Sequence, residues 1–191
     1  MRIISGKFKN KKLFFPLNIK TRPLKESVRE NIFNILEHSK FISTKIEGSL
    51  VLDLYAGTGS FGLECISRGA KKIYFVENDK EALLNLNQNI LKLKINDQVK
   101  IHSMDILKFF KNLNINKKID LVFLDPPYRN QEFIKFIEIL KEKEILNKNH
   151  VLVLHREYKI SKNSQELDAY KKNIIENRVY GRSEIFFLKF F

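Results

Sequence analysis

The sequence lacks the features of a secreted or membrane-inserted protein. Its one cysteine, Cys65, cannot form a disulfide within the chain, which fits a reducing cytosolic compartment. Residues 1–6 contain no long apolar core of a signal peptide, and no stretch approaches the roughly 18 consecutive apolar residues of a membrane span. We therefore expect a soluble, cytoplasmic protein that has no membrane partner.

The sequence also lacks internal repeats, low-complexity tracts and any linker that would divide residues 48–191. Its 191 residues are enough to bury roughly 70% of the unfolded surface around one core. The four histidines, His38, His102, His150 and His155, have neither the spacing of metal ligands nor a partner motif. We expect structural or surface roles for these histidines and no metal site.

Acidic residues are scarce relative to basic ones. The chain has 35 Lys and Arg against 22 Asp and Glu, which gives a net charge of +13. Residues 1–29, here called the basic arm, contain nine of the basic residues and a single acid, Glu26. A lysine can also lie on the surface in contact with solvent only, and we expect this for the lysines scattered elsewhere in the chain. For the basic arm the pattern favours contact with the phosphates of a polyanion.

Alternating strand and helix patterns predict an α/β fold. Short β-prone runs around Gly6 predict a small hairpin or an extended flap, and a helix of about four turns is expected from residue 24. The later alternation predicts a mostly parallel seven-stranded sheet with helices on both faces and an antiparallel C-terminal hairpin. The expected strands are residues 50–54, 72–76, 99–102, 119–124, 151–154, 173–180 and 184–190.

A glycine loop follows the first of these strands. Gly57 and Gly59 begin a Gly-x-Gly-x-x-Gly pattern, and Glu77 comes 20 residues after Gly57, where a carboxylate can hold ribose hydroxyls. Asp53, four residues before Gly57, would repel a pyrophosphate but suits a ligand that carries ammonium and sulfonium charge. The loop therefore predicts a nucleoside-bearing cofactor, and S-adenosylmethionine fits it better than NAD.

The same segment resembles a known motif. Asp53 to Gly59 resembles the first motif of class I methyltransferases, and Asp105 resembles the position in that family that contacts adenine. The alternative is that both aspartates are helix caps and that the glycines form a tight turn between a strand and a helix. The order of strand, turn and helix favours the cofactor site.

A second motif, Asp125-Pro126-Pro127-Tyr128, closes the apolar run at residues 119–124. The Asp125 carboxylate and the Pro126 carbonyl can accept the hydrogens of an exocyclic amine, so that the nitrogen lone pair faces an activated methyl group. The prolines stiffen this turn and remove N–H donors, while Tyr128 offers a flat face to an extruded base. The motif is similar to that of enzymes that methylate adenine N6, cytosine N4 or guanine N2. The alternative, a simple strand end, is disfavoured because the glycine loop is expected beside it.

Further blocks follow in order along nearly the whole chain. They are Arg2-Ile3-Ile4-Ser5-Gly6-Lys7-Phe8, Thr21-Arg22-Pro23, Val28-Arg29-Glu30-Asn31-Ile32-Phe33-Asn34-Ile35-Leu36 and Tyr180-Gly181-Arg182-Ser183. With the two motifs above, they resemble the RsmD family, whose members methylate N2 of a guanine in bacterial 16S ribosomal RNA within an assembled or assembling small subunit. The chain departs from the family at Ser5 and Leu24, where Ala and Thr are usual.

This resemblance implies a Rossmann-like class I methyltransferase with S-adenosyl-L-methionine as cofactor and 16S rRNA as partner, and we expect a monomer. Residues 1–47 would form an RNA-contacting hairpin and helix, and residues 48–191 the cofactor-binding domain. Arg182 fits equally well as a hairpin residue that pairs with a nearby acid. The implied contacts are Asp53, Ala56, Gly57, Gly59, Glu77, Asp105 and Ile106 for the cofactor, Asp125, Pro126, Pro127 and Tyr128 for the target amine, and Arg2, Lys7, Lys11, Lys12, Arg22, Arg29 and Arg182 for RNA.

Two other functions stay open. A DNA adenine-N6 methyltransferase would use the same Asp-Pro-Pro-Tyr motif, but such enzymes usually carry a separate recognition domain, and only a hairpin follows the core here. An RNA-binding ribosome assembly factor without activity is the other alternative. The presence of Asp53, Gly57, Gly59 and Asp125 argues against a lost activity.

Overall fold

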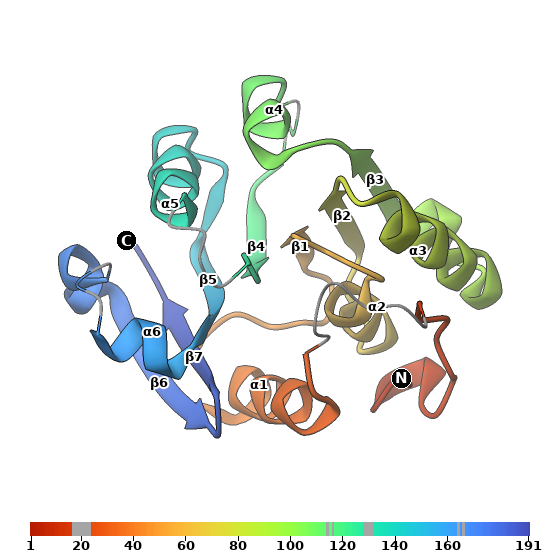
Figure 1. The fold of residues 1–191 in the computed structure, drawn as a ribbon, viewed down its shortest axis with the longest axis horizontal. Coiled ribbons are helices and arrows are strands. Elements are labelled where there is room, and N and C mark those ends of the chain that lie inside the picture. The colour runs from red at the N-terminus through yellow and green to blue at the C-terminus, as the bar shows by residue number, and fades with distance from the viewer. Residues whose placement is uncertain (17–23, 114, 116, 128–131, 164, 166) are drawn as a thin grey trace.

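A seven-stranded mixed sheet forms the centre of the molecule (Figure 1). The computed structural model describes residues 1–16, 24–113, 115, 117–127, 132–163, 165 and 167–191. The strands are β1 (Leu50–Leu54), β2 (Lys72–Glu77), β3 (Val99–Ser103), β4 (Ile119–Leu124), β5 (Leu146–Glu157), β6 (Ile174–Tyr180) and β7 (Ser183–Leu188). Their order is β3-β2-β1-β4-β5-β7-β6, with β1 to β5 parallel and β7 antiparallel to both β5 and β6. The predicted sheet with its antiparallel C-terminal hairpin is confirmed.

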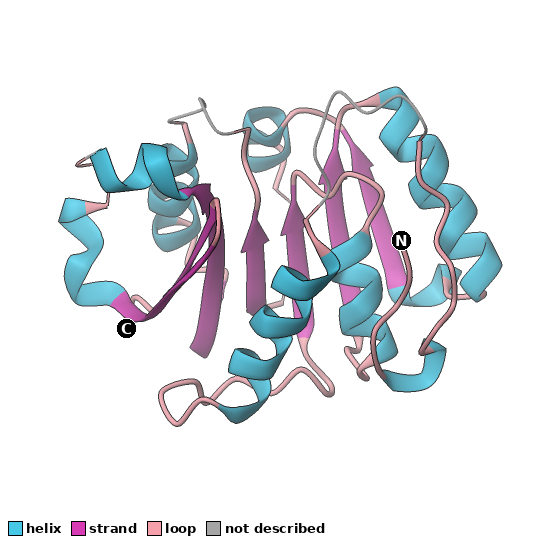
Figure 2. Cartoon of the chain, turned by 60° about the horizontal axis from the view of Figure 1, so that its bottom comes forward, coloured by secondary structure: helices cyan, strands magenta, loops and turns pink. Residues whose placement is uncertain are grey.

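Helices cover both faces of this sheet. They are α1 (Glu26–His38), α2 (Ser60–Ser67), α3 (Lys80–Leu93), α4 (Ile106–Lys111), α5 (Phe133–Glu142) and α6 (Tyr158–Asn163), with short 3-10 turns at Gly6–Phe8, Asn96–Gln98 and Asp168–Asn173. Since side chains alternate along a strand, Val51 and Phe123 pack with α1, α2 and α3, whereas Leu52 and Val122 pack with α4 and α5 on the other face. Figure 2 shows one helical layer crossing in front of the strands. None of the described helices is long and apolar enough to cross a lipid bilayer.

The start of the basic arm is an extended flap rather than a regular hairpin. A single antiparallel bridge joins Arg2 to Lys12 around the 3-10 turn Gly6–Phe8. Ile3 and Leu13 are buried in the same core as Val51 and Phe123 of the sheet. The described parts of residues 1–47 therefore share the core of the sheet. Their proposed separation from residues 48–191 concerns function and not packing.

The C-terminal end of α2 fixes the path of this flap. The amides of Ile4 and Ser5 donate to the Glu64 carboxylate at 2.7 and 2.9 Å, and the Phe8 amide donates to the Ser67 hydroxyl at 3.0 Å. Gly6 has φ 78° and lies so close to Ser67 that any Cβ would overlap its carbonyl oxygen. The backbone of the Arg2 to Phe8 block therefore takes its path from contact with α2, and Gly6 is required for that contact.

A second anchor joins the flap to the glycine loop. Asn89 of α3 is fully buried, accepts from the Phe14 amide at 2.6 Å, and donates to the carbonyls of Phe14 and Thr58, each at 3.2 Å. Thr58 lies between the first two glycines of the loop. One amide side chain therefore ties the basic arm to the predicted cofactor site.

Candidate active site

The candidate site lies where the strand order reverses. From β1, the chain proceeds to β2 and β3 on one side of the sheet, and to β4 and β5 on the other. Leu54 pairs with Leu124, so the glycine loop after β1 and the Asp125 motif after β4 leave the sheet side by side. Open α/β sheets bind ligands at the carboxyl ends of strands at such a reversal. The predicted adjacency of the two motifs is confirmed.

The glycines of the loop have different surroundings. At Gly57, φ is 56° and a Cβ would meet nothing within 4 Å, so this residue borders open space. Gly59 has φ 82° and packs on Leu86, while a Cβ at Gly62 would collide with the ring of Phe75. Gly59 and Gly62 therefore serve the tight strand-to-helix turn, and Gly57 leaves room for a ligand.

Glu77 at the end of β2 holds the glycine loop in place. Its carboxylate accepts from the amide of Gly57 at 2.7 Å and from those of Asn78 and Asp79 at 2.8 and 2.9 Å. A carboxylate has about four lone-pair positions, so one remains after these three bonds. The predicted contact with ribose hydroxyls is compatible with this arrangement.

Asp53 carries a buried acceptor. One oxygen accepts from the Gly62 amide at 3.0 Å and so caps the first turn of α2, as the alternative interpretation held. Oδ1 is buried and has no hydrogen-bond partner among the described residues. Burial raises the pKa of Asp53 well above its usual value, and the charges of Asp125 and Glu77 raise it further. A cationic ligand would relieve this cost, so the residues fit the ammonium and sulfonium of S-adenosylmethionine.

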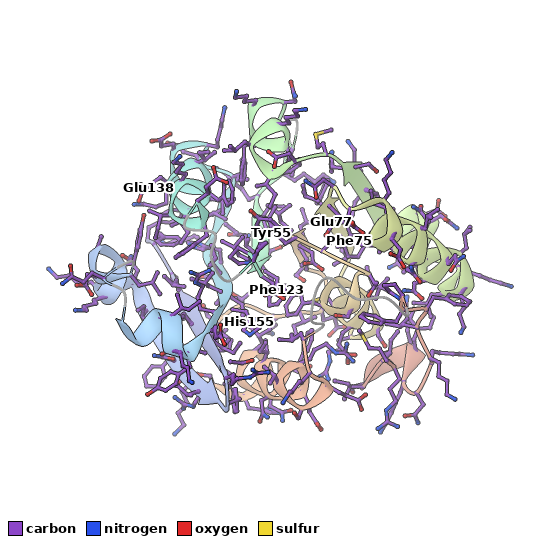
Figure 3. All side chains as sticks on the ribbon, viewed as in Figure 1. Tyr55, Phe75, Glu77, Phe123, Glu138 and His155 are labelled. Atoms are coloured by element: carbon purple, nitrogen blue, oxygen red, sulfur yellow. The ribbon has the colours of Figure 1, made fainter. Side chains whose placement is uncertain are left out.

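The predicted adenine contacts lie in the turn after β3 and at the start of α4. Asp105 is exposed and accepts from the Leu107 amide at 2.8 Å, which makes it the N-cap of α4, and Ile106 beside it is buried. Tyr55, directly after β1, has φ 59° and is half-buried, and no pattern in the sequence singled it out. Burial raises the Tyr55 pKa to about 12, and the charges of Glu132, Asp105 and Glu77 contribute. Figure 3 shows Tyr55 near the middle of the molecule, with Glu77 to its right and His155 below it.

The Asp125 carboxylate has a partner that the sequence analysis did not foresee. Its Oδ1 lies 2.8 Å from Nδ1 of His155, and Nε2 of His155 lies 3.0 Å from the Ser183 hydroxyl. His155 is buried, which agrees with the expected structural role, and its imidazole also contacts the motif. Pro126 is buried and Pro127 exposed, while Tyr128 lies outside the described residues.

Comparison with known proteins decides the family. A family model described as "Conserved hypothetical protein 95", which is the RsmD family, matches residues 1–189. The chain belongs to the RsmD family. It is 35% identical to "Ribosomal RNA small subunit methyltransferase D" of Buchnera aphidicola subsp. Acyrthosiphon pisum over 83% of this chain and 79% of that protein. The same name is given to a Haemophilus influenzae protein that is 33% identical over 82% of this chain and 79% of its own length.

A solved structure shares the fold of this RsmD-family chain. It is titled "Putative methyltransferase yhhF from Escherichia coli" and superposes with a TM-score of 0.80 at 25% identity, covering 98% of this chain and 96% of that one. The predicted Rossmann-like methyltransferase fold is therefore confirmed.

Most of the residues predicted to contact RNA lie on the surface of this RsmD-family chain. Arg2 pairs with Glu26 at 2.9 Å, and Lys7 donates to Gln98 at 3.1 Å. Lys11 and Lys12 are exposed in the same flap, and Arg182 is exposed in the turn between β6 and β7. Arg22 lies outside the described residues.

Arg29 is the exception and requires a correction. Its side chain is 0% exposed, its Nη2 donates to the Arg2 carbonyl, and its Nε lies 4.0 Å from a Glu64 oxygen. Burial lowers the Arg29 pKa, and the opposing charge of Glu64 offsets part of that shift. Arg29 therefore holds the flap from inside and is removed from the proposed RNA contacts.

Proposed function

We propose that this chain is an S-adenosylmethionine-dependent methyltransferase that modifies the N2 amine of a guanine in 16S ribosomal RNA. The observation that supports this proposal most directly is the arrangement of two neighbouring strand ends. One strand end presents a glycine loop with the buried, partly unsatisfied carboxylate of Asp53, and the other presents Asp125. A carboxylate suited to a cationic methyl donor and an acceptor for an amine would thereby lie next to each other.

Each residue of the site has a defined task in this reaction. S-adenosylmethionine supplies a methyl group that its sulfonium has already activated, so no metal or covalent enzyme intermediate is needed. Asp53 would face the cationic part of this cofactor, with the backbone of Ala56, Gly57 and Gly59 around it. Glu77 would bind the ribose, and Asp105 and Ile106 the adenine. These assignments follow the resemblance and agree with the burial and charge of the described residues.

Asp125 and Pro126 act on the target amine. The lone pair of a base amine is delocalised into the ring, so the nitrogen is a poor nucleophile until its hydrogens are held by acceptors. The Asp125 carboxylate and the Pro126 carbonyl provide such acceptors, and Tyr128 would stack on the base. In the transfer, the cofactor would supply the methyl group and keep the electron pair of the broken carbon–sulfur bond, and the Asp125 carboxylate would accept the proton that the amine releases.

Family membership and the basic arm support ribosomal RNA as the substrate. The relatives are named as ribosomal RNA small subunit methyltransferases, and Arg2, Lys7, Lys11 and Lys12 form an exposed basic flap that Asn89 connects to the glycine loop. In this proposal, the enzyme works as a cytoplasmic monomer on an assembled or assembling small subunit.

Methylation assays test this function directly. Purified protein with methyl-labelled S-adenosylmethionine should label 16S RNA, naked or in small subunits, taken from cells that lack the gene, and mass mapping should find N2-methylguanosine. RNA from cells that carry the gene should accept little label, because its site is already modified. Labelled N6-methyladenine in DNA would support the alternative enzyme instead. RNA binding without label in any nucleic acid would support the assembly factor.

The basic arm should contribute RNA affinity through charge. Reversing two exposed lysines, Lys7→Glu with Lys11→Glu, should weaken RNA binding and lower the slope of log affinity against log salt by about 2, because two phosphate contacts are lost. Cofactor affinity should stay unchanged in an equilibrium binding measurement.

A matched control separates this local effect from a change in total charge. Lys171→Glu with Lys172→Glu makes the same charge change in the exposed 3-10 turn before β6, at the opposite edge of the sheet. Equal losses of RNA affinity in both double variants would contradict a specific role of the basic arm.

A further inference from the structure

A buried hydrogen-bonded chain links the target-amine motif to the C-terminal hairpin. Oδ1 of Asp125 lies 2.8 Å from Nδ1 of His155, whose Nε2 lies 3.0 Å from Oγ of Ser183. The side chain of His155 is 5% exposed and that of Asp125 is 24% exposed. The imidazole is therefore inside the protein, while the carboxylate is partly exposed.

Strand register places these three groups. Leu124 pairs with Leu154 in the parallel β4–β5 ladder, so Asp125 and His155 are the next residues on neighbouring strands. In the antiparallel β5–β7 ladder, His155 pairs with Ile185 and Glu157 with Ser183, which makes Ser183 a diagonal neighbour of His155 on one face. The contacts thus depend on the register of a central sheet, with Asp125 directly after β4 and Ser183 at the start of β7.

The chemistry of the groups assigns the direction of each bond. An ionised carboxylate only accepts, so Nδ1 of His155 carries the hydrogen that Asp125 receives. In the neutral imidazole, Nε2 then accepts from the Ser183 hydroxyl, which selects this tautomer. Oδ1 of Asp125 therefore accepts a hydrogen bond from His155 inside the protein. Its other oxygen, Oδ2, has no hydrogen-bond partner among the described residues.

We propose that His155, oriented by Ser183, is a positioning residue for methyl transfer: its hydrogen bond fixes the Asp125 carboxylate so that Oδ2 faces the target amine. The terminal torsion of an aspartate is broad, so a carboxylate without such a partner would sample many orientations. A displacement of about 1 Å at a reacting group can cost on the order of 10²-fold in rate. This inference rests on the proposed function, because it concerns the acceptor of that reaction.

A simple structural role for His155 makes a different prediction. A buried histidine that merely satisfies its own polar atoms would affect stability, and any substitution that restores stability would restore activity. A positioning role requires a hydrogen donor at the place of Nδ1. Asparagine offers an N–H group near that place, whereas leucine fills similar space without a donor.

Three variants test the proposal in the full-length protein. His155→Leu should lower kcat for 16S RNA methylation by about 10²-fold, with unchanged affinity for S-adenosylmethionine and an unchanged KM for RNA. His155→Asn should recover most of kcat. Ser183→Ala should lower kcat to a smaller extent, because the imidazole keeps its contact with Asp125 but loses the bond that selects its tautomer.

His150 provides the matched control. It is also a buried histidine of β5, and its ring bonds the Asn147 carbonyl and the Phe190 amide, away from the motif. His150→Leu should lower the melting temperature and leave kcat near the wild-type value for the folded fraction.

The possible outcomes separate the two proposals. An inactive wild-type protein on every RNA substrate would contradict the proposed function. An active wild type with a normal kcat in His155→Leu, or with His155→Asn as slow as His155→Leu, would overturn the positioning role. If His155→Leu does not fold, His155→Asn and Ser183→Ala still test the positioning role. That role would be overturned if Ser183→Ala had the wild-type kcat and His155→Asn were no faster than a variant that lacks the carboxylate, Asp125→Ala.

Discussion

The Asp125→Ala variant is expected to bind S-adenosylmethionine and to lose methyl transfer by on the order of 10³-fold. The removed carboxylate is the charged acceptor for the target amine, and losing one such preorganised group costs about 10²–10³-fold in kcat. Loss of an acceptor for the departing proton adds to this effect. Single-turnover kinetics with saturating RNA would measure the chemical step, and calorimetry would measure cofactor binding.

Cofactor affinity should survive this change for an electrostatic reason. The charge of Asp125 is one of the causes that raise the pKa of Asp53. Removing that charge favours the ionised form of Asp53, which is the form that would pair with a cationic cofactor. The substitution therefore takes away an acceptor for the amine and leaves the cofactor pocket with at least its original negative charge.

Asp120 is a matched control on the same strand. Its carboxylate accepts from the Leu50 amide at 2.8 Å and from the Asn147 side chain at 2.7 Å, at the amino end of β4 away from the motif. Asp120→Ala should cost stability and retain methyl transfer by the folded protein. Normal turnover in Asp125→Ala, or equal losses of turnover in both variants, would remove the proposed role of Asp125.

The part of the site that sequence could predict depends on local motifs and a topological rule. The glycine loop and Asp125 each follow an apolar run, and parallel strands with right-handed crossovers bring their carboxyl ends to one edge. This was sufficient to place Asp53, Gly57 and Asp125 together. The six-residue α4 is too short to show a helical period, so only the alternative interpretation of Asp105 as a helix cap pointed to it.

The contacts of His155 could not be predicted in the same way. They depend on the register of β5 against both β4 and β7, and a shift by one residue would turn the imidazole to the other face. Nothing in the spacing between Asp125, His155 and Ser183 specifies that register. An apolar strand with one histidine at its carboxyl end, expected beside a catalytic strand end, is the signal that would have raised the possibility.

Arg29 shows a different kind of error. The positive charge of the basic arm led to an expected RNA contact at Arg29, although the spacing of apolar residues along the helix indicated a buried position. Arg29 lies on α1 next to Val28, three residues before Ile32 and four before Phe33, and is therefore within the apolar stripe of that helix. Helical spacing alone places it toward the core. The sequence could not reveal its partner, because Glu64 comes 35 residues later on α2.

The Glu64→Gln variant should lose about 3–5 kcal/mol of unfolding free energy, because it leaves the buried charge of Arg29 without its counter-ion and removes the 2.9 Å ion pair of Glu64 with Arg68. Arg29 and Glu64 are both fully buried, and Nε and Nη1 of Arg29 have no hydrogen-bond partner among the described residues. The neutral glutamine keeps the size of the side chain, so the loss reports charge and hydrogen bonding and not a cavity. Denaturant unfolding followed by circular dichroism would measure it.

Two further variants make this prediction specific. Glu37 also pairs with an arginine, Arg68, at 2.7 Å, but its side chain is 34% exposed, so Glu37→Gln should cost at most about 1 kcal/mol. Adding Arg29→Met to Glu64→Gln should recover much of the lost stability, because the unpaired buried charge is removed. A loss below about 1 kcal/mol in Glu64→Gln, or no recovery in the double variant, would contradict a buried pair between these residues.

The same substitution should also affect the basic arm. The Glu64 carboxylate accepts the amides of Ile4 and Ser5, and glutamine offers them one carbonyl oxygen and an NH₂ group that cannot accept. One amide of the flap is then left unsatisfied, so residues 1–16 should become more accessible to limited proteolysis than the rest of the chain. Asn89 still anchors Phe14 to the glycine loop, so cofactor affinity should fall less than RNA affinity. Equal losses of both affinities would mean that Glu64 supports the whole fold and not the docking of the arm in particular.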